Sequence, residues 1–462
     1  MTMIPPLRRF SWDRLRGLLT SDGLKGRIVR GAAFTMGSFG TAQVLRLTSS
    51  LILTRLLFPE AFGLMALLQV VLTGLMLLSD TGLQVSVLRH PRGDDPDFLN
   101  TVWTVKVIRG VALWLISCAL AWPMAAVYGE PIIAQLLPLL GLTLILKGIN
   151  PTAIATADRH MRFGRVTLIQ LSSQFITIAT SILLAWIFGS VWVLVWGILA
   201  GAVSNQILAR VFLPNSLNRF HWDGEIASEL FGFGRWILLG TAASYAVNNA
   251  DKMILGAFIS LEDLGIYNIG LMLAMLAYKI CGALKTKLLM PIYRMRPMQG
   301  NEANRRKTFA MRRLISGAGI AVMAVLAFVG IPLVDFLYDE RYALAGPIVV
   351  LFCLSLIPQI ITLGTGDLLL VSGDSWRAMH LTVARAVVQV PVLWFGVQWF
   401  GLAGAILAPA IAVIAVHPLR LHYARRYEGW DGVGEVGLLL LGVLPAGLAC
   451  WLHREELAAL FH

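Results

Sequence analysis

The feature that most constrains this chain is a series of long apolar runs separated by short polar connections. A helix needs about 20 mostly apolar residues to cross a hydrocarbon layer about 30 Å thick, and these runs reach that length. Lipid offers the backbone no hydrogen bonds, so such runs must be helices. Membrane strands would instead appear as short alternating segments. The runs therefore predict an all-α polytopic membrane protein.

The composition supports this class. Only 14% of the 462 residues are charged and the mean hydropathy is +0.73, whereas a soluble domain has roughly 25% charged residues. Most of the surface must therefore face lipid. The cysteines are widely scattered, so we expect small packing residues rather than metal ligands or disulfide partners. They are Cys118, Cys281, Cys353 and Cys450.

We expect thirteen spans, of which twelve form the core and the last is a C-terminal addition. The last span is barely long enough to cross, so a re-entrant or interfacial segment is the alternative. The expected spans are residues 31–57, 62–88, 101–128, 132–157, 166–188, 191–213, 235–260, 264–290, 309–337, 346–372, 378–400, 402–424 and 435–452.

Positive charge orients these spans. The N-terminus and the connections on its side hold 28 of the 38 Lys and Arg residues, whereas the other side holds only Arg55, Arg341 and Arg454. Because basic connections stay in the cytoplasm, the N-terminus is predicted to be cytoplasmic. This asymmetry explains the net charge of +12 without nucleic-acid binding. The basic stretch 294–313 is expected to attract anionic inner-leaflet lipids.

Short motifs recur in order along the two halves of the chain. Gly-Thr-Ala occurs at residues 40–42 and again at 240–242, and the acidic turn at 60–64 recurs at 262–266. Six helices per half make these parallel repeats, which normally enclose a central site. The expected parts are a cytoplasmic arm (1–30), an N-terminal six-helix half (31–213), a cytoplasmic linker (214–234), a C-terminal six-helix half (235–424) and an extension (425–462).

Residues 53–64, Leu-Thr-Arg-Leu-Leu-Phe-Pro-Glu-Ala-Phe-Gly-Leu, resemble the first outer turn of a known transporter family. This is the polysaccharide transport family of Wzx-type oligosaccharide-lipid flippases, within the multidrug/oligosaccharidyl-lipid/polysaccharide (MOP) exporter superfamily. Residues 80–83, 100–110 and 249–267 are also similar. One departure is the end, because many members carry fourteen helices.

The resemblance implies that an undecaprenyl-pyrophosphate-linked oligosaccharide moves across the bacterial inner membrane. Such transport would serve exopolysaccharide, O-antigen or capsule synthesis, alongside other glycan-assembly membrane proteins. No cofactor is implied, apart from a coupling proton or sodium ion.

Ionisable residues inside the membrane are costly, so each is a functional hypothesis. A passing pyrophosphate would supply the anion that an excess of embedded cations needs, and guanidinium groups suit phosphate oxygens. Arg46 is the strongest candidate, on a stripe with Gln43 and Ser50; a structural role is the alternative. The embedded cations are Arg46, Lys106, Arg109, Lys147, Lys252, Lys279 and Arg385, against the acids Asp80, Asp251 and Asp367.

A second polar stripe contains Asn248 and Lys252, with Asp251 beside it. Asp251 either carries a coupling proton or sodium ion or simply pairs with Lys252, and Asp80 is a second coupling candidate. Further candidates for substrate contact are Arg109, Lys147, which precedes the helix-breaking sequence Asn150-Pro151, and Lys279; structural roles remain open for each.

Two other functions are compatible with a polytopic chain. A cation-coupled multidrug exporter of the same superfamily would need buried acids for lipophilic cations, and these are few. A glycan polymerase or ligase would need a large loop or a carboxylate and histidine cluster, and the sequence shows neither. We therefore expect a transporter rather than an enzyme.

Overall fold

In the computed structural model, residues 24–79, 83–160, 162–214, 217–295 and 298–461 are described, and every regular element in them is helical. Much of the predicted arm, residues 1–23, lies outside the described residues. The first half of the chain contains α2 (Leu24–Leu56), α3 (Pro59–Leu78), α4 (Leu83–Arg89), α5 (Pro96–Tyr128), α6 (Ile133–Ile149), α7 (Ala153–Arg159), α8 (Phe163–Phe188) and α9 (Trp192–Phe212).

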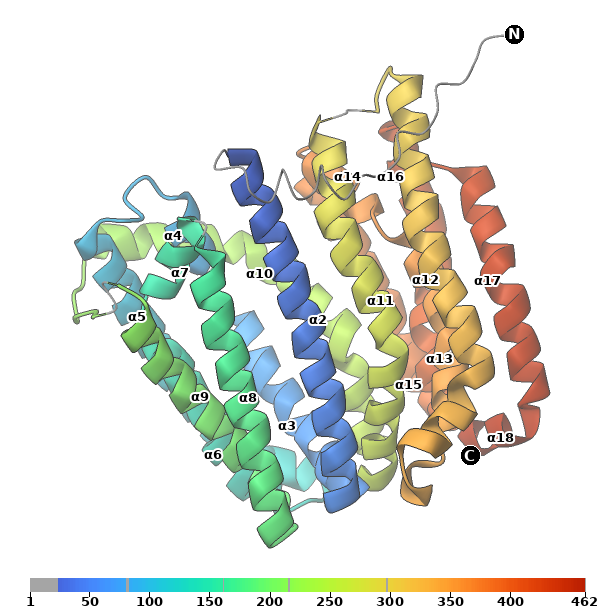
Figure 1. Cartoon of the computed structure of the whole chain (residues 1–462), viewed down its shortest axis with the longest axis horizontal. Helices are drawn as coiled ribbons and strands as arrows, with labels where there is room; N and C mark the ends of the chain where they lie inside the picture. Colours follow the sequence, from blue (N-terminus) through green and yellow to red (C-terminus); the bar gives the residue numbers. More distant parts are fainter. Residues whose placement is uncertain (1–23, 80–82, 161, 215–216, 296–297, 462) are drawn as a thin grey trace.

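The second half follows a similar order (Figure 1). Its elements are α10 (Gly224–Phe258), α11 (Leu261–Met295), α12 (Glu302–Leu337), η1 (Glu340–Tyr342), α13 (Ala345–Thr362), α14 (Thr365–Val371), α15 (Ser375–Ala415), α16 (His417–Arg426), α17 (Gly432–Leu452), α18 (Arg454–Ala458) and η2 (Ala459–Phe461).

Nine helical segments of the described residues are long and apolar enough to cross a membrane, or ten if the bent pair α6 and α7 counts as one span. The predicted all-α polytopic fold is therefore confirmed, while the count of twelve plus one remains a prediction. One of the nine is α17, the segment for which the sequence left both a crossing helix and a re-entrant or interfacial segment open. In Figure 1 it runs to the end of the bundle where α2 also ends.

Four spans that the sequence predicted as continuous are broken, and the last of these, 402–424, is divided between α15 and α16. The span 62–88 forms α3 and α4, the span 132–157 forms α6 and α7, and the span 346–372 forms α13 and α14. Proline removes a backbone donor and clashes with the preceding turn, which accounts for the bend of 56° at Pro151. At the third break Gly364 has φ 99°, which glycine adopts without steric cost. Breaks two and three occupy corresponding positions in the two halves.

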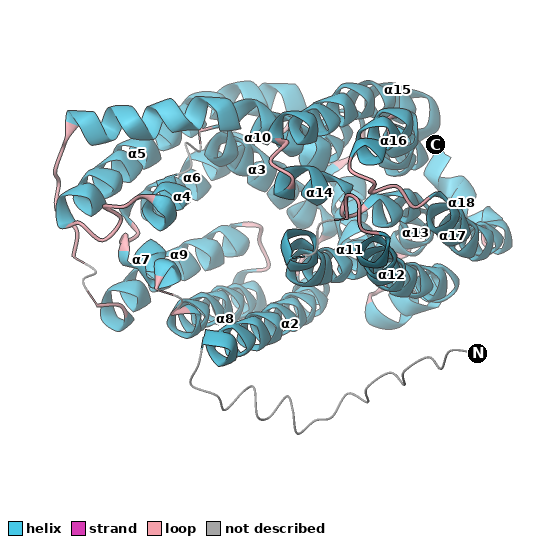
Figure 2. Ribbon diagram, turned by 90° about the horizontal axis from the view of Figure 1, so that it is seen from above, coloured by secondary structure: helices cyan, strands magenta, loops and turns pink. Residues whose placement is uncertain are grey.

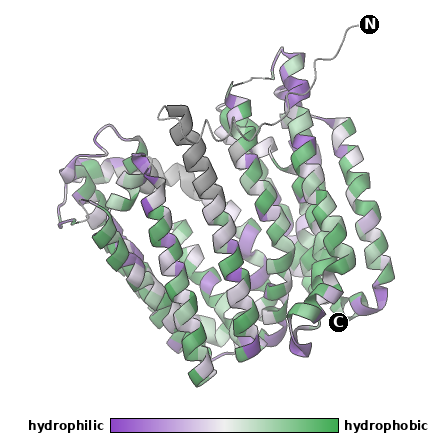
Figure 3. Ribbon diagram, viewed as in Figure 1, coloured by the Kyte–Doolittle hydropathy of each residue, from purple (hydrophilic) through white to green (hydrophobic). Residues whose placement is uncertain are grey.

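The helices form two groups that meet along one seam. Viewed from above, α4–α9 gather on one side and α11–α18 on the other, with α3 and α10 between them (Figure 2). Each group has its own apolar core, represented by Leu136 and Leu140 in the first half and by Ile348 and Ile357 in the second. Figure 3 shows hydrophobic residues along the lengths of the helices and hydrophilic residues gathered at their ends. The seam is thus the boundary between two packed bodies.

Helix α10 begins at Gly224, before the expected position of residue 235, and its first turns lie against the N-terminal half (Figure 1). Ile226 is buried in a cluster with residues of α4 and α5. The preceding segment is also held there, since the Asn218 side chain accepts from the Thr152 backbone at 3.0 Å and donates to the Thr152 hydroxyl at 2.8 Å. The backbone N–H of His221 donates to Thr104 Oγ1 at 3.0 Å. Residues near the predicted linker therefore pack on the first half.

The repeated acidic turns meet at the seam, at the end of the bundle where α2 ends and α3 begins; we call this the predicted outer end. A methyl group added at Gly63 would lie 2.0 Å from the Leu261 carbonyl oxygen, and one added at Gly265 would lie 2.0 Å from that of Pro59. The approach is reciprocal, as expected for equivalent positions of two repeats. It closes the predicted outer end by direct contact between helix backbones.

Arg341 adds a polar contact at the same end. Its guanidinium donates to the Thr54 carbonyl oxygen at 3.0 Å and forms an ion pair with Asp339 at 2.5 Å. The hydrogen bonds from Arg341 lower the pKa of Asp339 below its ordinary value. The end of α2 is thereby tied to η1, which belongs to the second half.

We expect Gly63→Ala to weaken this closure, because its methyl group meets backbone atoms that cannot swing away. Overpacking of this kind costs about 1–3 kcal/mol. Two measurements test it: thermal unfolding of the purified protein, and maleimide labelling from the outer side of a cysteine placed at Gln69 in a cysteine-free background. Gly40→Ala is the control, because nothing lies within 4 Å of its added methyl group. Equal labelling rates in both variants would contradict the assignment.

Candidate functional site

Three of the embedded cations, which come from different helices, lie close enough for their charges to interact. They are Arg46 on α2, Lys252 on α10 and Lys279 on α11, and Lys279 lies within Coulombic range of both others. The side chains of Arg46 and Lys279 are exposed. Neither makes a hydrogen bond or an ion pair with any described residue. The structure thus brings three sequence-predicted candidates near one another, and two of them lack an acidic partner among the described residues.

Lys252 differs from the other two cations because it has an acidic partner. Its ammonium lies 3.2 Å from Asp251 Oδ2, and the Tyr267 hydroxyl donates to the same oxygen at 2.8 Å. The side chains of Lys252 and Asp251 are 15% and 13% exposed. The ion pair that the sequence offered as one alternative is therefore present, and it leaves this corner of the seam close to neutral.

The other members of the two polar stripes lie apart from this cluster or bond locally. Ser50 is buried beside Tyr338. Asn248 donates to the carbonyl oxygen of Ser244 one turn earlier at 2.6 Å. Gln43 is half-buried on α2. A polar residue on the same helix face as an embedded cation therefore need not lie next to Arg46 or Lys279.

A pocket of about 240 Å³ opens between α3, α10 and α11 next to Lys252. Its polar lining includes Gln69 and Thr73 from α3 and Asn249 and Asn268 from the facing helices. Sequence analysis missed Gln69, Thr73 and Asn268, because single uncharged polar residues inside an apolar run carry little signal. The spacing of Gln69 and Thr73, four residues apart and so on one helix face, was the available sign.

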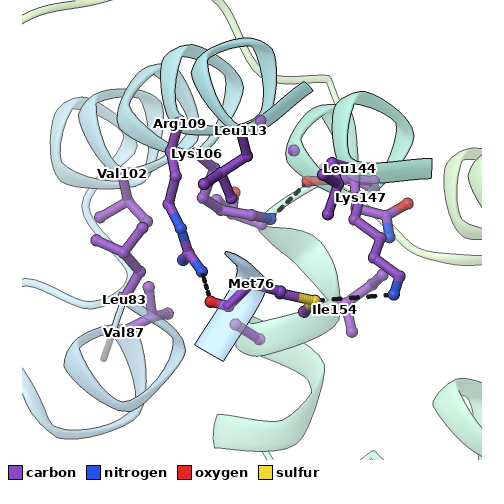
Figure 4. A pocket seen from close by; sticks show the side chains of 16 residues that line it. Met76, Leu83, Val87, Val102, Lys106, Arg109, Leu113, Leu144, Lys147 and Ile154 are labelled. Carbon is purple, nitrogen blue, oxygen red and sulfur yellow. Dashed lines mark hydrogen bonds between the residues drawn. The ribbon is translucent and has the colours of Figure 1, made fainter. Parts of the chain in front are cut away.

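Three further predicted cations line a separate cavity of about 250 Å³ inside the first half (Figure 4). Lys106 and Arg109 extend from α5, and Lys147 from the last turn of α6. Lys106 donates to the Asn150 carbonyl oxygen at 2.8 Å. Lys147 Nζ lies 3.7 Å from the Met76 sulfur. This cavity is lined by α3–α7 and their connections and contains no residue of the seam cluster.

Arg109 and Lys106 satisfy the ends of the broken helices. The last carbonyls of a helix lack partners within it and attract cations. Arg109 donates to the Met76 carbonyl oxygen at 2.5 Å and to Ser79 Oγ at 3.0 Å, at the end of α3. Lys106 serves the end of α6 in the same way. The geometry therefore favours the structural alternative for these two; Asp80, the second coupling candidate, lies outside the described residues.

Embedded charges of the second half are also matched. Asp367 forms an ion pair with Lys285 at 2.9 Å. The guanidinium of Arg385 donates to Gln359 Oε1 at 2.8 Å and to Gln389 Oε1 at 3.2 Å. These side chains therefore stabilise packing between helices and contrast with Arg46 and Lys279.

Residues 52–347 match the family model described as polysaccharide biosynthesis protein. The chain belongs to this family. The succinoglycan biosynthesis transport protein ExoT of Rhizobium meliloti (strain 1021) is 22% identical over 328 residues, which are 69% of this chain and 63% of that protein. The resemblance to polysaccharide transporters that the sequence showed is confirmed.

Two solved structures share the fold of this family member. The lipid II flippase MurJ, in an inward closed conformation, has a TM-score of 0.68 and 12% identity, covering 92% of this chain and 99% of that one. An inward-facing multidrug resistance transporter of the MATE family, within the MOP superfamily, has a TM-score of 0.61 and 15% identity, covering 88% and 95%. At these identities the similarity concerns the fold alone.

Replacing Arg109 with Leu should destabilise the protein by about 1–3 kcal/mol, because the Met76 carbonyl and the Ser79 hydroxyl at the end of α3 lose their charged donor. Thermal or denaturant unfolding of the purified variant measures the loss. Arg46→Leu is the matched control, since Arg46 donates to no described residue and its loss should leave unfolding unchanged. If the Arg109→Leu protein is as stable as the unsubstituted protein but fails in export, Arg109 binds substrate and the structural role is wrong.

Proposed function

We propose that this family member is a flippase that moves an undecaprenyl-pyrophosphate-linked oligosaccharide across the bacterial inner membrane by alternating access. The observation that carries the proposal is the uncompensated pair Arg46 and Lys279 in the seam, with Lys252 nearby. A cation inside a membrane protein is costly unless it meets an anion or water. A pyrophosphate group supplies such an anion.

The chemistry of the two uncompensated side chains suits a diphosphate. The planar guanidinium of Arg46 can donate two parallel hydrogen bonds to phosphate oxygens, whereas the ammonium of Lys279 acts as a compact point charge. Because the seam lies between two separately packed bodies, a relative movement of these bodies can change which side has access. The contact at Gly63 and Gly265 would be the one that opens toward the outside.

The charge pattern disfavours the alternative of a multidrug exporter for lipophilic cations. Such a substrate would need exposed acids in the seam, whereas Asp251 is already bound by Lys252 and Tyr267. A polymerase or ligase would need reactive groups as well as binding groups. Transport of an anionic lipid-linked glycan therefore accounts for the seam best.

We further propose that the N-terminus is cytoplasmic and that the basic start of α12 lies at the inner leaflet. Part of this charge is matched within the protein, as in Arg313 with Asp431 at 2.5 Å and Arg305 with Glu428 at 3.3 Å. Exposed Lys307 remains available to anionic lipid headgroups. We also propose that the protein contacts other membrane proteins of glycan assembly.

Arg46→Ala and Lys279→Met should each lower export of surface glycan about tenfold or more, because a hydrogen bond to a charged group contributes about 1.5–3 kcal/mol. Surface glycan and inner-side lipid-linked oligosaccharide are measured in cells lacking the chromosomal copy. Lys307→Met, an exposed cation outside the seam, is the control. Normal export by Arg46→Ala would remove Arg46 from the site. Accumulation on the outer leaflet instead would favour a polymerase or ligase.

We propose Asp251 as the coupling group. It is a half-buried acid that forms an ion pair with Lys252 and accepts a hydrogen bond from the Tyr267 hydroxyl, so a proton or sodium ion could compete with Lys252 for the carboxylate. Asp251→Asn should abolish the dependence of transport on a proton or sodium gradient in proteoliposomes, while substrate binding at equilibrium is retained. A gradient dependence equal to that of the unsubstituted protein would overturn this role and leave Asp251 as an ion-pair partner only.

A further inference from the structure

The pocket between α3, α10 and α11 differs in chemistry from the cation cluster that it adjoins. Gln69, Thr73 and Asn268 line it and make no hydrogen bond with any described residue. Asn249 uses one amide hydrogen for the Tyr245 carbonyl oxygen at 3.2 Å. Polar side chains this far inside a membrane protein face water or a ligand, because lipid offers them no partner.

The local charge of the pocket is close to zero. Its one charged lining residue is Lys252, whose ammonium is paired with Asp251. Neutral amides and a hydroxyl both donate and accept hydrogen bonds, which is the pattern that sugar hydroxyls require. An anion would instead be drawn to Arg46 and Lys279.

The pocket lies outward of Lys279, the deepest of the three cations, and at about the depth of Arg46, which is about 15 Å from the predicted outer end of α2. At about 1.5 Å of rise per residue, Gln69 is about 15 Å and Asn268 about 10 Å from the predicted outer ends of α3 and α11. Lys279 is about 27 Å from the same end of α11. Lys252 belongs to the pocket and lies within Coulombic range of Lys279, so the two regions adjoin.

The size of the pocket limits its ligand. Its volume of about 240 Å³ corresponds to about eight water molecules at about 30 Å³ each. That space accommodates a single sugar ring, and the other sugars of a repeat unit would extend out of the open side of the pocket. Apolar Phe62, Met65 and Val70 complete the wall and can cover the C–H face of such a ring.

We propose that this pocket is the sugar subsite of the transporter, in which Gln69, Thr73 and Asn268 bind the hydroxyls of one ring of the glycan. The inference rests on the proposed function, since it assigns the pyrophosphate to Arg46 and Lys279. The bound substrate then lies with its diphosphate at Arg46 and Lys279 and one sugar ring in the adjoining pocket. Gln69, Thr73 and Asn268 are thus specificity determinants for the glycan.

The test compares two probes on purified protein in nanodiscs. One is undecaprenyl pyrophosphate, which carries no sugar, and the other is the lipid-linked oligosaccharide extracted from cells in which this gene is deleted. The double variant Gln69→Leu with Asn268→Leu should bind the oligosaccharide probe about tenfold more weakly and undecaprenyl pyrophosphate unchanged. Arg46→Ala is the matched variant and should weaken both probes. Retained binding of undecaprenyl pyrophosphate shows that the double variant is folded.

The remaining outcomes separate the two proposals. Failure of the unsubstituted protein to bind either probe would overturn the flippase function and the sugar subsite with it. If the double variant binds both probes as tightly as the unsubstituted protein, or binds both more weakly by the same factor, the sugar subsite alone is overturned. The amide oxygens could also ligate sodium; if the double variant alters only the sodium dependence of binding, the pocket is a cation site and this inference is wrong.

Discussion

The cost of placing charge in hydrocarbon is the constraint on which this molecule depends. Each embedded cation must be hydrogen-bonded, paired or exposed to a wet space. Lys285 is paired with Asp367, and Arg385 is held by two amides. Arg46 and Lys279 have neither kind of partner among the described residues. The contrast between paired and unpaired cations therefore points to the seam as the binding region, because an anionic ligand there could pair with Arg46 and Lys279.

A second constraint acts on the backbone where helices break inside the membrane. At the end of α6, three side chains donate to backbone carbonyl oxygens. Gln206 donates to that of residue 146, Trp103 to that of residue 149 and Lys106 to that of residue 150. At the end of α13, Ser316 donates to the Ile360 carbonyl oxygen at 3.1 Å. Breaks in corresponding positions of two repeats often mark binding regions. Here the break between α6 and α7 is stabilised by Lys106, one of the embedded cations that the sequence analysis treated as a functional hypothesis.

The fold was largely predictable because apolar length and charge asymmetry are one-dimensional signals. The repeat was also readable, and its glycines at 63 and 265 meet at the seam. The site was harder. Arg46 and Arg109 look alike in sequence, since both are arginines inside spans, and only their neighbours distinguish an open charge from a helix cap. Gln69 and Asn268 gave no signal because their importance arises from packing three helices that are distant in sequence.

Two opposing effects act at this seam: the helix contact that closes its predicted outer end, and the repulsion between the cations inside it. The predicted outer end is held by backbone contact at Gly63 and Gly265, which needs no ligand. Deeper in the protein, the charge of Lys279 interacts unfavourably with that of Arg46 and with that of Lys252, although Lys252 is itself paired with Asp251, and like charges in a low-dielectric interior interact more strongly than in water. Any movement that narrows the space between these charges therefore costs more when it is empty than when it holds an anion. If the proposed function holds, a bound pyrophosphate removes this repulsion, so the substrate itself lowers the barrier to changing which side is open. This dependence of the switch on the anion follows from two cations without acidic partners among the described residues and one close helix contact.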